Sequence, residues 1–144
     1  MEIQTMSRRL KIVGVVNLIF GAICALAALP ALNMPAMMFA DLVIWPIGAG
    51  VDGTSPVARL MLAIAGGVIA GLGAIWFAAS GKPCEEAPMA VRKMLTAGAL
   101  TWFVIDSTGS LLAAAPLNVL GNAGYLLLLL WPVWGVTSAK QLAA

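Results

Sequence analysis

Residues 57–80 read VARLMLAIAGGVIAGLGAIWFAAS, and this stretch decides the class of fold. Its single charge, Arg59, lies close to its start, and the other residues are apolar or small. A helix of roughly 20 such residues crosses the hydrocarbon core of a bilayer, which is about 30 Å thick. Further apolar stretches of comparable length lie at 10–29, 94–115 and 117–137. The sequence therefore predicts an all-α fold, a bundle of four transmembrane helices that makes residues 1–144 a single integral membrane domain.

The composition supports lipid as the main surroundings of these side chains. Hydrophobic residues make up 62% of the chain and charged residues 10%, which lies outside the usual balance of a soluble domain. The eight basic and six acidic residues give a formal net charge of only +2 and form no basic face, so we expect no nucleic-acid partner. We predict a multi-pass protein of a bacterial inner membrane.

The placement of charge predicts the orientation. Seven of the eight basic residues flank the spans on one side, and only Arg59 falls on the other. The seven are Arg8, Arg9, Lys11, Lys82, Arg92, Lys93 and Lys140. Lys and Arg accumulate in cytoplasmic loops, so both termini and the loop between the second and third spans are predicted to be cytoplasmic. Trp76, Trp131 and Trp134 would then lie at the inner interface, where such rings are enriched.

The first apolar stretch has an alternative interpretation. Its basic start and its ending AALPA, residues 27–31, are similar to a secretory signal peptide, whose cleavage would leave three spans. The apolar run from Ile12 to Leu29 is longer than the about 7 to 15 residues of a signal peptide's apolar region. Pro30 also fits poorly at a small-residue cleavage site. We therefore predict that the span is retained.

The connection between the first two stretches contains a short helix of its own. Apolar residues recur near helical spacing from Pro35 to Trp45, and Pro46 ends the pattern. We predict a helix at the outer interface, and the alternative is a lid over a substrate site. Ser55 followed by Pro56 is typical of an N-cap and a first helical turn, so the second span should begin there.

Two features bear on how the helices pair. The first and third spans end alike, with LAALPALN at 26–33 and LAAAPLN at 112–118. This similarity indicates a duplicated helical hairpin, and the alternative is chance alignment of Ala- and Leu-rich segments. Asn17, a lone polar residue in the first span, is predicted to form an interhelical hydrogen bond.

Small residues in the second span also indicate close packing. They recur at every fourth position in two rows, Ala63–Gly67–Gly71 and Ala70–Ala74–Ala78. Association of helices in lipid depends on van der Waals contact, which small residues make close. We expect contact with another helix of the same bundle along these rows, and contact in a homodimer is the alternative.

The residues that most enzymes use are missing from the sequence. There is no His, which removes the usual general base and the commonest transition-metal ligand. Cys24 and Cys84 form no CxxC motif, and the charges of Glu85 and Glu86 should raise the pKa of Cys84. No phosphate-binding loop or nucleophile elbow is found. We predict no catalytic residue, no metal and no cofactor.

Asp106 is the deepest charge in the predicted spans. An ionised carboxylate near a helix centre in lipid costs roughly 2.5 to 3.5 kcal/mol and normally faces a partner, a cavity or an ion path. Counting helix rise from the outer ends brings further polar residues to a similar level. We predict a polar cluster in the outer half, formed by Asp106, Arg59, Ser110, Asn122 and Tyr125. It is interpreted either as a binding or proton-exchange site, or as bonds that only fix the helices.

Several short motifs resemble a known type of protein. The pattern Ser55-Pro56-x-x-Arg59, followed by Gly66-Gly67, Trp102-x-x-x-Asp106 and Asn118-x-x-x-Asn122, is similar to small four-helix bacterial inner-membrane proteins. The resemblance covers nearly the whole chain. It implies the four-helix fold and the outer polar cluster, and no activity comes with it.

Three functions remain. An accessory or assembly subunit, with a membrane-protein partner or a second copy of the chain, fits the small size and the lack of catalytic residues. A small proton- or ion-coupled transporter would use the intramembrane Asp106. An intramembrane enzyme acting on lipid is the third alternative. We expect the first.

Overall fold

The computed structural model describes residues 1–48, 50 and 52–135, and these residues form helices and turns but no strand. The long helices are α1 (Ile3–Leu26), α3 (Pro56–Ala79), α5 (Pro88–Leu112) and α6 (Pro116–Leu130). The shorter ones are η1 (Pro30–Leu32), α2 (Met34–Val43), α4 (Lys82–Glu86) and η2 (Trp131–Val133). Lys140 and the predicted end of the fourth span at residue 137 lie outside the described residues.

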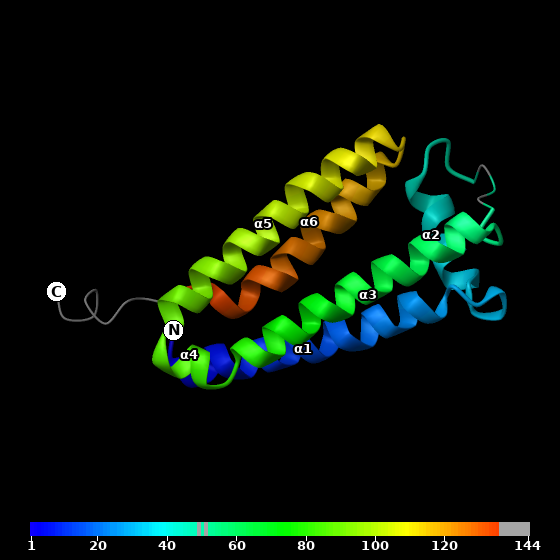
Figure 1. Ribbon diagram of the computed structural model, residues 1–144. Coiled ribbons are helices and arrows are strands. Elements are labelled where there is room, and N and C mark those ends of the chain that lie inside the picture. Colours follow the sequence, from blue (N-terminus) through cyan, green and yellow to red (C-terminus); the bar gives the residue numbers. More distant parts are fainter. Residues whose placement is uncertain (49, 51, 136–144) are drawn as a thin grey trace.

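The long helices form two antiparallel pairs (Figure 1). α1 and α3 lie side by side along their length and make the most extensive contact between any two elements, and α5 and α6 form the second pair. The pairs meet at the end that holds α4 and the N-terminus, here called the narrow end. They diverge toward the end that holds α2, here called the wide end. The predicted all-α fold is therefore confirmed, and the four long helices are arranged in the shape of a V.

Three segments are long and apolar enough to cross a membrane. They are α1, α3 and Pro116–Val133, which joins α6 to η2. This property supports a membrane protein. α5, which contains the predicted third span 94–115, is as long but is not among them. Its polar residues, from Arg92 near its start to Asp106, lower its hydropathy.

Local sequence signals account for where α2 and α3 begin and end. The Ser55 hydroxyl accepts a hydrogen bond from the amide of Ala58 at 3.2 Å, and Pro56 occupies the first turn of α3, as predicted. α2 ends at Val43, close to the predicted limit at Trp45. The capping signals fix helix ends because they satisfy amides that have no partner within the helix.

α1 and α5 begin earlier than the apolar stretches that predicted them. α1 starts at Ile3 and α5 at Pro88, so the basic residues expected to precede the spans lie on the helices instead. Lys and Arg are good helix formers, so a helix can include the basic residues that precede its apolar stretch. Hydropathy therefore marks the apolar part of a helix and not the helix end.

α1 and α3 pack backbone against backbone. A Cβ added at Gly66 would collide with the backbone of Gly21 and Ala25, and one added at Gly73 would collide with the backbone of Gly14. Such close approach gives two helices the van der Waals contact that holds them together in lipid. These glycines explain why α1 and α3 stay in contact along their length.

The row of small residues that makes this contact differs from the prediction. Gly67 and Gly71 have nothing within 4 Å of an added Cβ, so the predicted row Ala63–Gly67–Gly71 does not face α1. In the second predicted row, Ala70 contacts Gly21, whereas Ala74 and Ala78 are exposed. The helix carries small residues on two faces, and their spacing alone does not show which face packs against α1.

Within the described ranges, the two pairs share a buried core at the narrow end. The buried side chains there come from all four long helices and include Met6, Leu10, Trp76, Leu95, Ala99 and Leu129. The indole nitrogen of Trp76 also donates to the carbonyl of Leu129 at 3.1 Å. Farther along α1, Phe20 is 47% exposed. The V is thus closed by packing at one end.

Candidate functional site

Amide and hydroxyl side chains join α5 to α6 toward the wide end. The Asn118 amide donates to the Ser110 hydroxyl at 2.8 Å, and the Asn122 amide donates to the Ser107 hydroxyl at 3.2 Å. Ser110 donates in turn to the backbone carbonyl of Asp106 at 2.7 Å. Two of the five predicted site residues, Ser110 and Asn122, thus take part in bonds between α5 and α6, each with a partner outside the predicted set. The bond from Ser110 to Asp106 lies within α5 and involves only the backbone of Asp106.

Sequence reasoning missed the roles of Ser107 and Asn118. In an antiparallel hairpin, residues at equal distances from the turn face each other. Ser110 and Asn118 lie at equal distances from Ala114, and Ser107 and Asn122 at nearly equal distances. Asn and Ser side chains are known to bond across helices in lipid. Their mirrored spacing was therefore the signal that could have found these pairs.

Tyr125 contacts the other helical pair instead of Asp106. Its hydroxyl donates to the side-chain oxygen of Asn17, and the Asn17 amide donates to the carbonyl of Val13 at 2.8 Å. The interhelical hydrogen bond predicted for Asn17 is confirmed. The Tyr125 ring meets Trp102 edge-on with centroids 5.0 Å apart, and Phe20 lies 6.5 Å away. These rings place aromatic side chains of α1, α5 and α6 next to one another.

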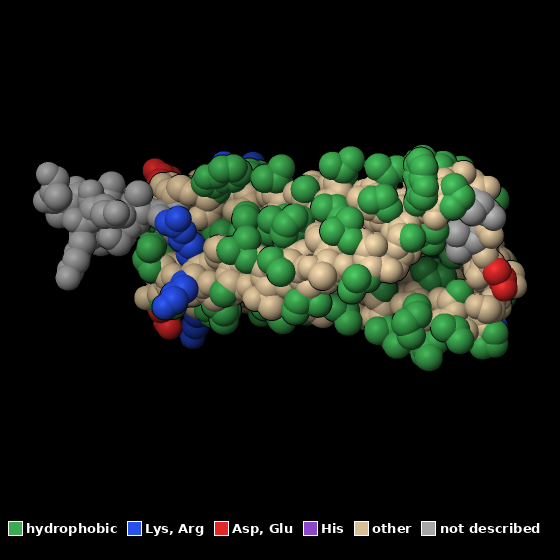
Figure 2. Space-filling model, turned by 90° about the horizontal axis from the view of Figure 1, so that it is seen from above, with side chains coloured by type: hydrophobic (Ala, Val, Ile, Leu, Met, Phe, Trp, Pro, Cys, Tyr) green, Lys and Arg blue, Asp and Glu red, His purple; other side chains and the backbone are tan. Residues whose placement is uncertain are grey.

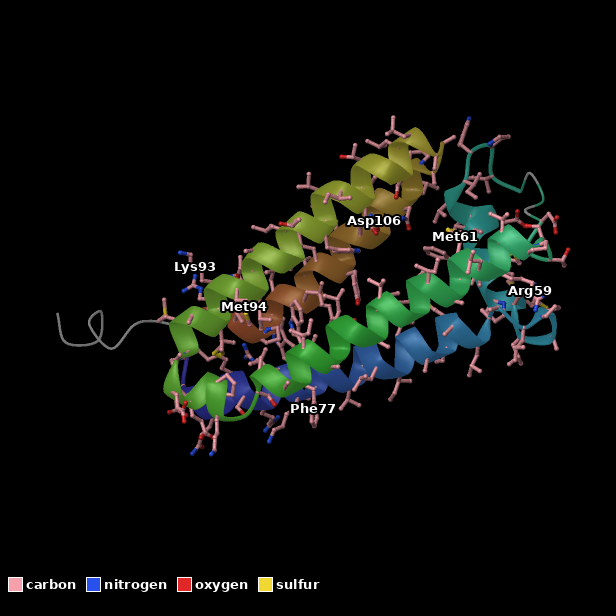
Figure 3. All side chains as sticks on the ribbon, in the orientation of Figure 1. Arg59, Met61, Phe77, Lys93, Met94 and Asp106 are labelled. Atoms are coloured by element: carbon pink, nitrogen blue, oxygen red, sulfur yellow. The ribbon has the colours of Figure 1, made fainter. Side chains whose placement is uncertain are left out.

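Arg59 is not brought to the cluster. Its guanidinium Nε donates to the backbone carbonyl of Ala28 at 2.7 Å, just beyond the C-terminal end of α1. Figure 3 shows Arg59 near the wide end, on the side of α3 that faces away from Asp106. The structure therefore does not bring Arg59 into the predicted polar cluster with Asp106. Ala28 belongs to the turn that follows α1, so Arg59 ties the first turn of α3 to the end of the α1 segment.

Asp106 lies on the face of α5 that forms the core. The buried residues Leu95 and Ala99 precede it and buried Ser110 follows it at helical spacing. Its side chain is half-buried, and in Figure 3 it lies where α5 faces α6 and the space between the pairs. Across residues 1–48, 50 and 52–135, its carboxylate has no hydrogen-bond or ion-pair partner. Asp106 is therefore a charge that the described chain leaves uncompensated.

The polar atoms around Asp106 are in a different situation. Every buried side-chain nitrogen or oxygen among the described residues has a hydrogen-bond partner. Asn17, Ser107 and Asn122 are all deeply buried and all paired. Among the described residues, the buried neutral polar groups are therefore all paired, whereas the half-buried carboxylate of Asp106 is not.

α2 and the connection around it occupy the wide end. The amide of Trp45 donates to the carbonyl of Ala114 at 2.7 Å, which ties the connection to the turn between α5 and α6. The Asn33 amide donates to the carbonyl of Gly53 at 3.3 Å. Figure 1 shows α2 between the start of α6 and the start of α3. The connection therefore bridges the two pairs where they are farthest apart.

The cysteines do not form an activated thiol site. Cys84 is buried in α4, and its burial raises the pKa of the thiol, with the charge of Glu85 as a second cause in the predicted direction. A thiol with a raised pKa is less often the reactive thiolate. Within the described part of the chain, no three His, Cys, Asp or Glu side chains are grouped to bind a metal ion.

Comparisons with known proteins add no assignment. No protein-family model, no curated protein and no solved structure matches this chain. The function is therefore argued from the residues and their geometry.

Proposed function

We propose that the chain is a four-span protein of a bacterial inner membrane with both termini in the cytoplasm, and that it acts as an accessory or assembly subunit of a larger membrane complex. α5 would be the remaining span. It runs antiparallel to α6 over most of its length, and α6 belongs to a segment that is apolar enough to cross a membrane. A helix that lies along a spanning helix must occupy the same layer.

The charge distribution supports the proposed orientation. In Figure 2 most of the visible Lys and Arg side chains gather at the narrow end. These basic residues belong to α1, α4 and α5 and are Arg8, Arg9, Lys11, Lys82, Arg92 and Lys93. By the positive-inside rule this end faces the cytoplasm.

The uncompensated Asp106 carries the proposal of a subunit. An ionised carboxylate in lipid costs roughly 2.5 to 3.5 kcal/mol, and the described residues offer no partner to offset that cost. A cationic or hydrogen-bond-donating side chain on the helix of another membrane protein would do so. Asp106 is half-buried, so part of its side chain remains exposed for contact with such a helix.

Substitution of Asp106 tests the proposed role. The tagged protein would be purified from its native membrane in mild detergent, and the mass of the particle would be measured by light scattering. We expect a particle heavier than one chain that is lost in Asp106→Asn and kept in Asp106→Glu. Thr108→Val is the matched control, because Thr108 is exposed and its hydroxyl bonds only to Val104 of its own helix.

Two outcomes would contradict the subunit proposal. One is a wild-type particle that contains a single chain and nothing else. The other is an Asp106→Asn particle with the same partner and the same stability as the wild type. Circular dichroism of each variant separates loss of the partner from loss of the fold.

Cysteine accessibility tests the proposed fourth span. In a variant with Cys24 and Cys84 replaced by Ser, single cysteines at Glu86 and Ala113 would be labelled in intact cells with a membrane-impermeant maleimide. We expect Ala113→Cys to react from outside and Glu86→Cys to react only after the cells are opened. If both react from the same side, α5 does not cross the membrane.

A proton- or ion-coupled transporter is the second candidate, because an open acid on a helix face that lines the V is also where a coupling proton would bind. Proteoliposomes with an internal pH dye would show an outward-to-inward proton flux that Asp106→Asn abolishes. Such a flux from the isolated chain would favour the transporter over the subunit. Among the described residues, no arrangement of side chains favours an enzyme acting on lipid.

A further inference from the structure

A groove lies beside the first turns of α1 at the narrow end, next to η2. Its volume is about 390 Å³. Its lining includes Gln4, Thr5, Arg8, Arg9, Ile12 and Trp131. We call it the inner groove. A second hollow of about 240 Å³ shares Arg8 and Gln4 with it and adds Lys11, so cations line both sides of this part of α1.

Arg9 is fixed in place before any ligand arrives. Its guanidinium carbon lies 4.9 Å from the centre of the Trp131 ring, a cation–π contact, and one of its nitrogens lies 3.3 Å from the sulfur of Met1. A side chain held in this way loses less conformational entropy when it binds a partner. The inner groove is therefore organised around one positioned cation and the exposed Arg8 beside it.

The groove changes from charged to apolar along α1. Arg8 and Arg9 lie toward the narrow end, and Ile12, 42% exposed, lies one turn deeper beside Trp131. Glu2 and Glu85 each line one of the two hollows, but the arginines and Lys11 outnumber these acids. A phospholipid is complementary to this arrangement, because its negatively charged phosphate is followed by apolar acyl chains.

We propose that the inner groove binds the phosphate of an anionic phospholipid of the cytoplasmic leaflet, with Arg8 and Arg9 as the binding residues and Ile12 and Trp131 against the start of an acyl chain. Basic pockets at the cytoplasmic side of transmembrane helices suit anionic headgroups. Guanidinium groups also bind phosphate through charge-assisted hydrogen bonds that can be bidentate. The proposal assumes that the narrow end lies at the inner interface and is independent of the role of Asp106.

Lipid titration tests this site. Purified protein would be delipidated in detergent and titrated with phosphatidylglycerol or phosphatidylcholine, and bound lipid would be counted by native mass spectrometry. We expect preferential binding of phosphatidylglycerol. Arg8→Gln/Arg9→Gln should weaken it roughly tenfold or more, because each cation near an anionic headgroup contributes about 1 kcal/mol. Lys82→Gln/Lys93→Gln is the matched control, since it removes the same charge at the same end outside the groove.

The remaining arms distinguish the source of the phosphate and protect against misfolding. Glycerol phosphate, a soluble headgroup without acyl chains, should not displace the bound lipid. The single variant Arg8→Gln keeps the contact of Arg9 with Trp131 and should also weaken binding. It provides the test if the double variant does not fold. Equal loss of lipid in the groove and control variants, displacement by glycerol phosphate, or no preference for phosphatidylglycerol would overturn the proposal.

Discussion

The two helical pairs are joined by different chemistry. α1 and α3 touch through glycine backbones, at Gly21 against Gly66 and at Gly14 against Gly73. α5 and α6 are joined by side-chain hydrogen bonds between Ser and Asn residues. In α5 and α6 the glycines at 98, 109 and 124 have nothing within 4 Å of an added Cβ. The similar endings of the first and third spans therefore do not extend to similar packing, and duplication of the hairpin remains a hypothesis.

The two pairs therefore differ in the kind of surface that they can offer to a partner. Backbone contact between glycines fixes α1 against α3, and two polar bonds are added near the ends of the pair, from Ser7 to the carbonyl of Ser80 and from Arg59 to the carbonyl of Ala28. In the proposed function this pair serves as a rigid support. The facing surfaces of α5 and α6 carry the Ser and Asn side chains that bond between these two helices, and α5 also carries Asp106. Polar groups in lipid are costly and tend to mark functional surfaces. The comparison is consistent with the proposed function, in which one pair is the support and the other carries the interaction surface.

The largest effect is expected at the glycine contact. Gly66→Leu would force α1 away from α3, because its Cβ meets the backbone of Gly21 and Ala25, which cannot move aside locally. We expect a loss of about 3 kcal/mol in the free energy of unfolding, at the upper end for overpacked sites. Unfolding by SDS in mixed micelles, followed by circular dichroism, would measure it.

The neighbouring glycine provides the control. Gly67 has the same flanking sequence but open space around an added Cβ, so Gly67→Leu should change stability by less than about 0.5 kcal/mol. Equal destabilisation by both substitutions would mean that α1 and α3 do not pack through their backbones. The first half of the comparison would then be lost.

A smaller effect is expected at the polar contact of the second pair. Ser107→Ala removes the acceptor of the Asn122 amide and should cost about 0.6 kcal/mol, and at most about 1.7 kcal/mol, as is typical of such bonds in membrane proteins. Thr108→Ala should cost almost nothing, since Thr108 is exposed and bonds only within its own helix. A cost for Ser107→Ala as large as that for Gly66→Leu would remove the proposed difference between the pairs.

Features that depend on neighbouring residues could be predicted from the sequence. The limits of α2 follow from Pro35 and Pro46, and the start of α3 follows from the Ser55 cap. Each of these depends on one segment of the chain and on the geometry of a single helix.

Rotation of the helices could not be predicted in this way. Consecutive helical residues point about 100° apart, so Gly66 and Gly67 differ completely in what they face, yet spacing treats them alike. Arg59 was placed near Asp106 by depth alone, whereas its direction around α3 leads it to the end of α1. The direction of a side chain is decided by contacts between helices that are far apart in sequence.

The junction of the two pairs offers the mildest test, through the reactivity of Cys84. This thiol is fully buried in α4, with its sulfur 4.0 Å from the carbonyl of Ile3, so alkylation requires the narrow end to open. Burial and Glu85 raise its pKa, so at neutral pH it holds less thiolate than an ordinary cysteine, whose pKa is about 8.5. Maleimide labelling in detergent should therefore be slower for Cys84 than for Glu86→Cys in a Cys84→Ser background. The labelling rate of Cys84 should also continue to rise at pH values where the rate of the exposed cysteine has reached its plateau.

Glu85→Gln should increase the labelling rate of Cys84 only slightly, since burial, the larger cause of the raised pKa, remains. Equal rates at neutral pH would mean that the pairs separate at the narrow end as well, and a rigid support joined to an open polar surface would no longer describe the molecule.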